Sequence, residues 1–199
     1  MKIFVINGGQ KFAHSNGSFN ASLTCWTKEV IENLGFDIRI THVNEEYNKA
    51  DEVENFKWAD VIIYHTPIWW FQVPNRLKLY IDEVFTEGYQ VLYKSDGRSH
   101  VNPAINYRTG GLLQNKYYML TSTWNAPEEA FTLENEFFDQ TSVDDGILFG
   151  LHKMNQFLGL KRLDGMHFHD LEKNETQDRV DQYEIKYKEL LKNTLKDLK

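Results

Sequence analysis

Two tryptophans and a phenylalanine lie between two prolines in residues 67–74, PIWWFQVP. The proline rings fix φ and remove two backbone donors, so they stiffen this segment. A stiff aromatic loop is suited to stacking against a flat, π-rich ligand. A hydrophobic plug that covers the end of a sheet would have the same composition. The segment by itself therefore predicts either a ligand-binding loop or a plug.

Small polar residues follow a glycine turn near the N-terminus. The turn is Asn7-Gly8-Gly9, and the loop continues to Gly17 before a helical pattern begins. The start of a helix favours anions, and polar side chains there donate to phosphate oxygens; those present are His14, Ser15, Asn16, Ser18 and Asn20. The loop has neither GxGxxG nor GxxxxGK[ST]. It predicts a phosphate site, and an ordinary turn with Ser18 as the helix N-cap is the alternative.

Other reactive residue types do not form a recognisable set. The chain has seven histidines and a single cysteine, Cys25, without HExxH or CxxC spacing, so the sequence predicts no metal site. It also lacks the GxSxG motif of a hydrolase nucleophile. We therefore assign no side chain as catalytic. If the protein is an enzyme, we expect a bound cofactor to carry the reactive atom.

Short apolar runs alternate with amphipathic segments along the chain. The predicted strands are residues 2–6, 36–43, 61–66, 117–123 and 160–168. The predicted helices are residues 18–34, 53–58, 75–85, 147–158 and 176–198. This alternation predicts an α/β fold with a doubly wound, five-stranded parallel sheet, strand order 2-1-3-4-5 and helices on both faces. The aromatic loop then leaves the carboxyl end of a central strand, where open sheets bind ligands, and Asn75 caps the next helix.

Length and composition are those of a globular domain. The 199 residues are 41% hydrophobic and 14% aromatic, which is enough for a core. We expect a single domain over residues 1–199, with an irregular insertion at about residues 86–116 that contains several glycines and tyrosines. Loops of this length inside compact domains are usually functional or disordered.

Charge and hydropathy narrow the class of partner. The net charge of −7 argues against binding to nucleic acid. No apolar run approaches the roughly 20 residues of a membrane span. A lone cysteine excludes an internal disulfide and fits a reducing compartment, so the expected location is cytoplasmic.

Several motifs occur in order along nearly the whole chain. They are KFAHSNGSFN at residues 11–20, WAD at 58–60, PIWW at 67–70, YIDEVFTEG at 80–88, SDGR at 95–98, GGL at 110–112, TWNAP at 123–127, HK at 152–153 and NQFLG at 155–159. On these motifs the chain resembles the flavodoxin-like NAD(P)H:quinone oxidoreductases. The resemblance implies a flavodoxin-like fold and FAD bound at the carboxyl edge of the sheet in a homodimer.

The resemblance also implies a set of cofactor-binding residues. Those that would hold the pyrophosphate are Ser15, Asn16, Gly17, Ser18, Phe19, Asn20, Ala21 and Ser22. Those along the isoalloxazine ring are Pro67, Ile68, Trp69, Trp70 and Phe71, and those on its other flank are Thr123, Trp124, Asn125 and Ala126. Tyr107 falls on a further cofactor-contact position. Two features depart from the family. Ile68 stands where relatives often have glycine. The tyrosine–histidine pair that assists hydride transfer in the more distant mammalian quinone reductase has no clear match in this sequence.

The function that this resemblance implies is an FAD-dependent NAD(P)H:quinone oxidoreductase. It would reduce quinones by two electrons in a ping-pong mechanism, with NADPH or NADH as the reductant. Two alternatives stay open, because a fold does not fix a function. One is an electron carrier that binds flavin without nicotinamide-dependent turnover, and the other is a flavin-free binding module. Residues 86–116 and 128–145 favour the enzyme, since such long segments are able to build substrate walls.

Overall fold

The computed structural model describes residues 1–12, 17–173 and 176–198 of the chain. Its strands are β1 (Lys2–Asn7), β2 (Asp37–His42), β3 (Val61–Pro67), β4 (Tyr117–Thr123), β5 (Lys161–Arg162) and β6 (Met166–Phe168). Its helices are α1 (Ser18–Asn33), α2 (Lys49–Trp58), α3 (Asn75–Glu87), α4 (Glu129–Thr132), α5 (Phe149–Phe157) and α6 (Gln177–Asp197). The alternation of strands and helices confirms the predicted α/β fold.

The strands form a parallel sheet in the order β2-β1-β3-β4-β5, and β6 also pairs with β4. The predicted order is confirmed, but the fifth strand is split into β5 and β6. Between the two pairings β4 advances three residues, from Tyr118 to Thr121, whereas the fifth strand advances four, from Arg162 to Met166. The extra residue interrupts the ladder, as in a β-bulge. Gly165 lies in this interruption, and an added Cβ there would come within 1.8 Å of Leu120 O.

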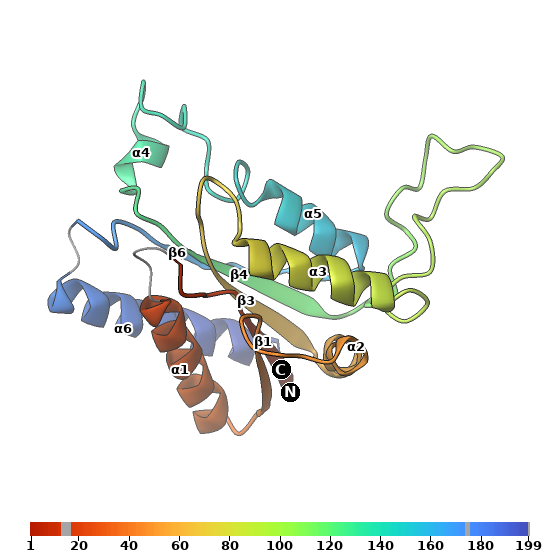
Figure 1. Cartoon of the computed structure of the whole chain (residues 1–199), viewed down its shortest axis with the longest axis horizontal. Helices are drawn as coiled ribbons and strands as arrows, with labels where there is room; N and C mark the ends of the chain where they lie inside the picture. The colour runs from red at the N-terminus through yellow and green to blue at the C-terminus, as the bar shows by residue number, and fades with distance from the viewer. Residues whose placement is uncertain (13–16, 174–175, 199) are drawn as a thin grey trace.

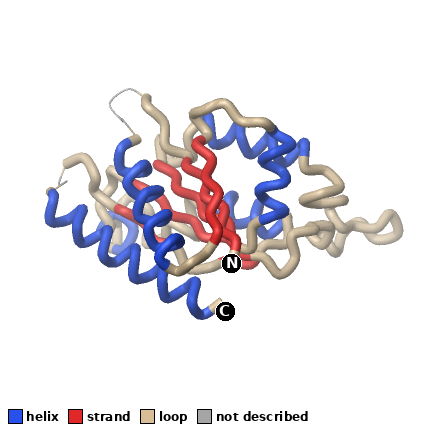
Figure 2. The backbone as a smooth tube through the Cα atoms, turned by 90° about the horizontal axis from the view of Figure 1, so that it is seen from below, coloured by secondary structure: helices blue, strands red, loops and turns tan. Residues whose placement is uncertain are grey.

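Helices cover both faces of the sheet (Figures 1 and 2). Helices α1 and α6 pack on one face, together with Ile3 and Val5 of β1. Helices α2, α3 and α5 lie on the other face, together with Phe4 and Ile6. Successive residues of β1 therefore point into two different cores, which explains why a central parallel strand is a continuous apolar run.

Two helix caps differ from their predictions. Gly17, and not Ser18, is the N-cap of α1, with a left-handed φ of 69°, and Ser18 is already the first helical residue. Pro74 is the N-cap of α3, and neither helix has a side-chain cap hydrogen bond. The Asn75 side chain instead accepts a hydrogen bond from Gln10 Nε2 at 3.1 Å. A long-range contact has thus replaced the local cap that the sequence predicts.

The segment between α3 and β4 contains no helix or strand and projects from the body as an arm (Figure 1). We define the arm as residues 94–111. An isolated bridge between Tyr93 and Gly111 closes its base. Its apolar side chains include Val101, which is 96% exposed, and Ile105 and Tyr107, which are also exposed. Within the described part of the chain, no helix is long and apolar enough to cross a membrane.

Candidate active site at the carboxyl edge of the sheet

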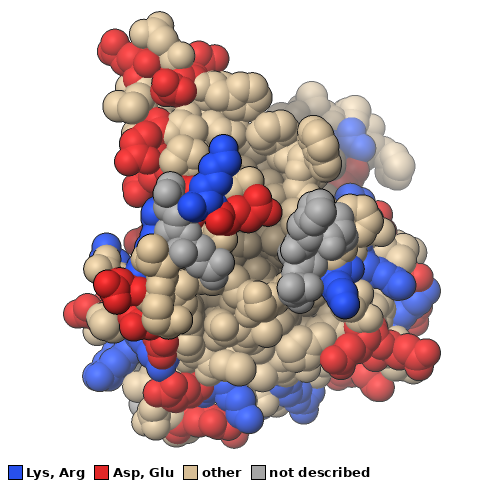
Figure 3. Space-filling view, turned by 60° about the vertical axis from the view of Figure 1, so that its left-hand side comes forward, with Lys and Arg blue, Asp and Glu red and all other residues tan. Residues whose placement is uncertain are grey.

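Hydrogen bonds join the loops that follow the central strands. Ile68 N–H, just after β3, donates to Thr123 O at 3.0 Å. Trp124 N–H, just after β4, donates to Phe168 O at 2.8 Å. The loops of β3, β4 and β6 therefore meet at one edge, as parallel strands require. Figure 3 looks toward this side of the molecule, where residues other than Lys, Arg, Asp and Glu form most of the middle of the face and a few charged side chains lie above them.

A buried network fixes the strands beneath this edge. Thr27 Oγ of α1 lies 2.9 Å from His65 Nε2 of β3 and 2.7 Å from Tyr187 OH of α6. His65 Nδ1 lies 2.7 Å from Thr121 Oγ of β4. Burial lowers the pKa of His65 to about 3, so the ring is neutral at physiological pH. The network ties two helices to two strands without placing a charge in the core.

The start of α1 brings part of the predicted phosphate site to this edge. Asn20 is 2% exposed, and its Oδ1 accepts a hydrogen bond from Thr123 Oγ at 3.2 Å. Its Nδ2 has no hydrogen-bond partner among the described residues. Phe19 packs against Trp26 and Phe168, so its side chain belongs to the core.

The remaining residues predicted around this helix start differ in exposure. Ser18 and Ala21 are exposed, whereas Gly17 and Ser22 are half-buried. Three further predicted residues, His14, Ser15 and Asn16, lie outside the described residues.

The aromatic loop after β3 forms a tight turn. Trp69 N–H donates to Gln72 O at 2.9 Å, and Gln72 N–H donates back to Trp69 O at 3.0 Å. The central residues Trp70 and Phe71 have φ values of 48° and 62°, as in a type I′ turn, which normally carries Asn and Gly. Left-handed backbone costs such residues about 1–2 kcal/mol each, and strain of this kind clusters at functional sites.

This turn separates its aromatic side chains. The Trp70 side chain is 92% exposed, whereas Phe71 stacks on Phe137 with a centroid distance of 5.4 Å. Trp69 stacks on Phe12 at 5.3 Å. Pro67 is buried at the end of β3, and Ile68 is half-buried. The indole of Trp70 is thus the flat surface that this loop presents outward, which fits the ligand-binding interpretation better than the plug.

Contacts with neighbouring segments of the protein hold the loop after β4 in place. The Trp124 indole is buried, donates from Nε1 to Ser122 Oγ at 2.7 Å and packs edge-on against Phe131. The exposed Asn125 donates from Nδ2 to Glu172 Oε2 at 2.7 Å. Ala126 O accepts from the backbone N–H of Asp170 at 3.2 Å. The Trp124 side chain therefore supports the loop from within.

A carboxylate on the side of the sheet that carries α5 gathers two histidines and an arginine. Asp144 Oδ1 lies 2.8 Å from His152 Nε2 and 3.3 Å from His167 Nε2, and Oδ2 pairs with Arg162. Burial by itself would raise the pKa of the Asp144 carboxyl. The hydrogen bonds from both histidines and the charge of Arg162 outweigh that effect and hold the pKa well below its usual range.

Both histidines extend the cluster toward β4. His152 Nδ1 lies 2.9 Å from Tyr118 OH, and His167 Nδ1 lies 2.7 Å from Ser122 Oγ. Ser122 Oγ already accepts from Trp124, so its proton is free to donate to His167 Nδ1. The Nε2 atom of a neutral His167 then carries the hydrogen that faces the carboxylate. A continuous hydrogen-bonded chain thus runs from the loop after β4 to Asp144, and no local sequence pattern indicates it.

Tyr107 does not join the other predicted residues. It contacts Phe157 at the end of α5 and lies beside Gly159 and Lys161, which precede or begin β5. These residues mark the amino end of the sheet, so Tyr107 lies at the opposite end from the loops after β3 and β4. Figure 1 shows the arm, to which Tyr107 belongs, on that side of the molecule. Within one copy of the chain, the structure brings together the described loop residues of the predicted set but not Tyr107.

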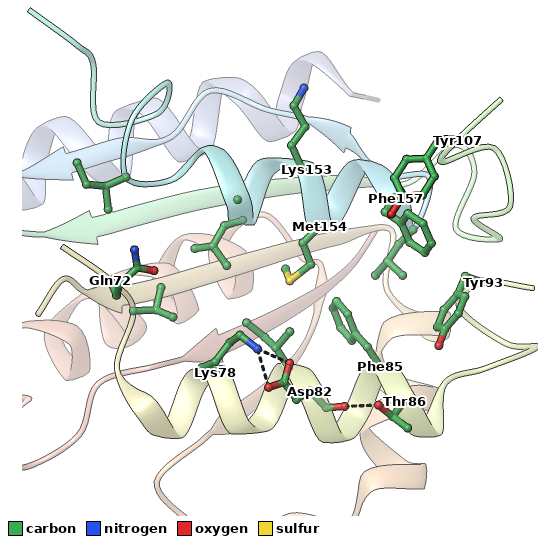
Figure 4. Close-up of a pocket in the computed structure, with 16 residues that line it drawn as sticks. Gln72, Lys78, Asp82, Phe85, Thr86, Tyr93, Tyr107, Lys153, Met154 and Phe157 are labelled. Atoms are coloured by element: carbon green, nitrogen blue, oxygen red, sulfur yellow. Dashed lines mark hydrogen bonds and ion pairs between the residues drawn. The ribbon is translucent and has the colours of Figure 1, made fainter. Parts of the chain in front are cut away.

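An open groove of about 680 Å³ runs between α3 and α5, and Gln72 and Tyr107 lie toward its two ends (Figure 4). Phe85 of α3 and Met154 of α5 point into the space between the helices. The charged Lys78 and Asp82 pair with each other at its side. The groove therefore offers an apolar surface that connects the carboxyl edge with the arm.

The carboxyl edge suits a nucleotide with a flat ring. A helix N-terminus favours anionic groups, the unpartnered Nδ2 of Asn20 is a buried donor, and Trp70 offers an exposed aromatic face. These groups fit a flavin nucleotide. Among the described residues, no group of three His, Cys, Asp or Glu side chains is placed to hold a metal ion.

Comparison with known proteins agrees with this geometry. The family model described as the flavodoxin-like fold matches residues 1–191. The chain belongs to the flavodoxin-like family. This flavodoxin-like protein is similar in structure to an FMN-dependent NADH-azoreductase from Bacillus anthracis, with a TM-score of 0.67 and 13% identity over 96% of this chain and 98% of that one. Identity this low shows a shared fold only.

Two curated relatives match the flavodoxin-like protein over most of their length. It is 44% identical over 187 residues to the NADPH:quinone oxidoreductase MdaB of Haemophilus influenzae, which covers 94% of this chain and 95% of that protein. It is 49% identical over 178 residues to an uncharacterised protein of Schizosaccharomyces pombe, covering 89% and 90% of the two chains. The resemblance to flavodoxin-like NAD(P)H:quinone oxidoreductases is thereby confirmed.

Proposed function

We propose that this protein is a flavin-dependent NAD(P)H:quinone oxidoreductase. The observation that carries the proposal is the meeting of three loops at one edge, where Asn20, Thr123 and the exposed Trp70 come from different parts of the chain. A buried amide donor at a helix start and an exposed indole are what a nucleotide with a flat ring needs. The 44% identity with a quinone oxidoreductase supports nicotinamide nucleotide and quinone as the substrates.

The chain's own groups would bind, orient and shield the cofactor. Bound flavin would supply the chemistry, by taking two electrons from NAD(P)H and passing them to a quinone. The N-terminus of α1 would hold the anionic end of the nucleotide, and Asn20 would donate to the nucleotide from its buried Nδ2. Trp70 would stack on its ring, and the wall formed by Phe71 and Phe137 would exclude water. Because stacking requires only a flat ring, a single face is able to accept the two substrates in turn, which predicts ping-pong kinetics.

The proposed cofactor is FAD. The support is the long loop between Asn7 and Gly17, together with the family resemblance. The competing expectation is FMN, because some proteins of the same fold bind it. Flavin released by heat and separated by chromatography would decide between the two. FMN as the sole product would contradict the choice of FAD.

The proposed assembly is a homodimer in which each copy lends Tyr107 to the other. Tyr107 lies at the far end of the groove between α3 and α5. If two copies pack groove to groove about a two-fold axis perpendicular to the groove, the helices run antiparallel, and the arm of one copy reaches toward the carboxyl edge of the other. The exposed Val101 and Ile105 of the arm would then be covered.

The function is tested by spectroscopy and steady-state kinetics on the full chain. We expect a yellow protein that oxidises NADPH or NADH in the presence of a quinone, with parallel double-reciprocal plots at varied quinone concentration. Intersecting plots would contradict the ping-pong mechanism. A long-lived semiquinone without nicotinamide-dependent turnover would favour the electron carrier, and a colourless protein that takes up neither FAD nor FMN would favour the binding module.

A further inference from the structure

Two buried amide side chains at the carboxyl edge are incompletely hydrogen-bonded. Gln10 is 8% exposed and Asn20 is 2% exposed. Within the described parts of the chain, Gln10 Oε1 and Asn20 Nδ2 are the buried side-chain atoms without a partner. Buried polar groups are nearly always satisfied in native proteins, so such atoms mark places where a ligand or water completes the site. Gln10 lies outside the family motifs, and no local sequence pattern indicates a role for it.

The loop after β1 places the two amides close together. Gly9 is so close to Asn20 that an added Cβ would lie 2.8 Å from Asn20 Cβ. Asn7 fixes the same stretch, because its Oδ1 accepts from Gly9 N–H at 2.8 Å and its Nδ2 donates to Asn20 O at 3.3 Å. Gln10 follows directly, and its backbone lies beside Gly17, the N-cap of α1. The two amides therefore flank one short piece of backbone at the start of α1.

The Gln10 side chain reaches from this loop to the next one. Its Nε2 donates to Oδ1 of Asn75, the first residue of α3, at 3.1 Å. Asn75 directly follows the aromatic loop of residues 67–74. Gln10 thus bridges the loop expected to hold phosphate and the loop expected to lie along the ring. In a flavin nucleotide the ribityl chain connects these two parts.

The unpartnered atoms themselves indicate the class of ligand group. Asn20 Nδ2 is a donor and Gln10 Oε1 is an acceptor. An ionised phosphate oxygen only accepts, so it would satisfy Asn20 and leave Gln10 unsatisfied. A hydroxyl group both donates and accepts, so it satisfies either amide. We propose that Gln10 is a cofactor-binding residue that, with Asn20, hydrogen-bonds ribityl hydroxyl groups of the flavin; this rests on the proposed function.

The inference is tested by combining a substitution at Gln10 with flavins that carry progressively less of the ribityl phosphate chain. The full chain, freed of flavin, is titrated with lumiflavin, riboflavin, FMN and FAD while flavin fluorescence is followed. The variant is Gln10→Met, which keeps an unbranched side chain of similar length and removes the amide. We expect about 5- to 30-fold weaker binding of riboflavin, FMN and FAD, by the same factor, since one hydrogen bond is lost. Lumiflavin, which has no ribityl chain, should bind both proteins equally.

Each alternative outcome has its own meaning. Equal affinity of Gln10→Met and the original chain for riboflavin would overturn the inference and leave the proposed function intact. Weaker binding of FMN and FAD alone would place Gln10 at the phosphate and also overturn it. If the original chain bound none of the four flavins, the proposed function itself would fail. Thermal unfolding of both proteins verifies that the variant is folded.

A second variant keeps the test available if Gln10→Met folds poorly. Asn20→Asp retains the Oδ1 acceptor used by Thr123 and removes only the Nδ2 donor. Its added charge would repel phosphate, so the comparison uses the phosphate-free riboflavin and lumiflavin. Weaker binding of riboflavin with unchanged lumiflavin would support the ribityl site, and equal binding of riboflavin would overturn it.

Discussion

The hydroxyl of Thr123 donates a hydrogen bond to Asn20 Oδ1 across 3.2 Å, although the two residues are 103 positions apart in the sequence. One ends the strand β4 and the other lies in the first turn of α1. The bond uses the acceptor of the Asn20 amide and leaves its donor available to a ligand. The fold thus orients the Asn20 amide with the last residue of a second strand, which the family resemblance also predicts to contact the cofactor.

Because the backbone is strained at Trp70, one substitution there should raise the stability of the protein and lower its affinity for flavin. The substitution Trp70→Gly removes a side chain that is 92% exposed and relieves a positive φ, so it should raise the free energy of unfolding of the flavin-free protein by about 1 kcal/mol. The same change should weaken flavin binding by about 1–3 kcal/mol through lost stacking. Urea unfolding and fluorescence titration measure the two effects. Phe71→Gly is the matched control, because it relieves the same strain but loses the contact with Phe137; full flavin affinity in Trp70→Gly would contradict the stacking role.

Asp144 should make stability depend on acid pH. Its pKa in the folded protein lies below the unfolded value, so its contribution is fully present above about pH 4–5 and is lost as pH falls through the folded pKa. Asp144→Asn should therefore lower the free energy of unfolding by about 1–3 kcal/mol at pH 7, and the difference from the original chain should narrow below about pH 4. Denaturant unfolding at several pH values tests this. Asp145→Asn, where the carboxylate accepts from Ser142 instead, is the control and should show no such trend.

A charge in the groove should dissociate the proposed homodimer. Met154 points into the space between α3 and α5, so Met154→Asp should convert the protein to monomers at micromolar concentration. Flavin occupancy should fall with it, because the partner's Tyr107 is lost. Ile185→Asp is the control: this residue is 65% exposed on α6, on the other side of the sheet. Light scattering measures both, and an original chain that is active as a monomer would refute the assembly.

Substitution of two glycines, Gly165 in the split fifth strand and Gly150 on α5, should change stability in opposite directions. Gly165→Ala would place Cβ 1.8 Å from Leu120 O, so β6 must move away from β4, and we expect a loss of about 3 kcal/mol in the free energy of unfolding. Gly150→Ala adds a methyl group on α5 with no atom within 4 Å, and should raise stability by about 0.5–1 kcal/mol. Urea unfolding measures both. A neutral Gly165→Ala would show that the close approach is not required.

Elements that depend on local patterns were predictable from the sequence. The apolar run of β3 marks a strand buried on both faces, and the spacing of Leu77, Tyr80, Ile81 and Val84 marks the inner face of α3; all four are buried. Alternating strands and helices then leave few parallel topologies, of which the observed strand order is one. The aromatic loop and the residues near the start of α1 reach the carboxyl edge for the same reason.

Features that depend on distant contacts were decided by the tertiary structure alone. Asn75 is the first helical residue and accepts from Gln10 of another loop instead of capping its helix. Asp144 meets His152, Arg162 and His167 only once α5 and the fifth strand are packed. Tyr107 falls on a cofactor-contact position of the family, yet within one copy of the chain it lies at the other end of the sheet. The sequence determined which segments form strands and helices, because side-chain periodicity is local. Which polar groups meet depends on packing between segments far apart in the chain, and a single sequence does not encode that in any local pattern.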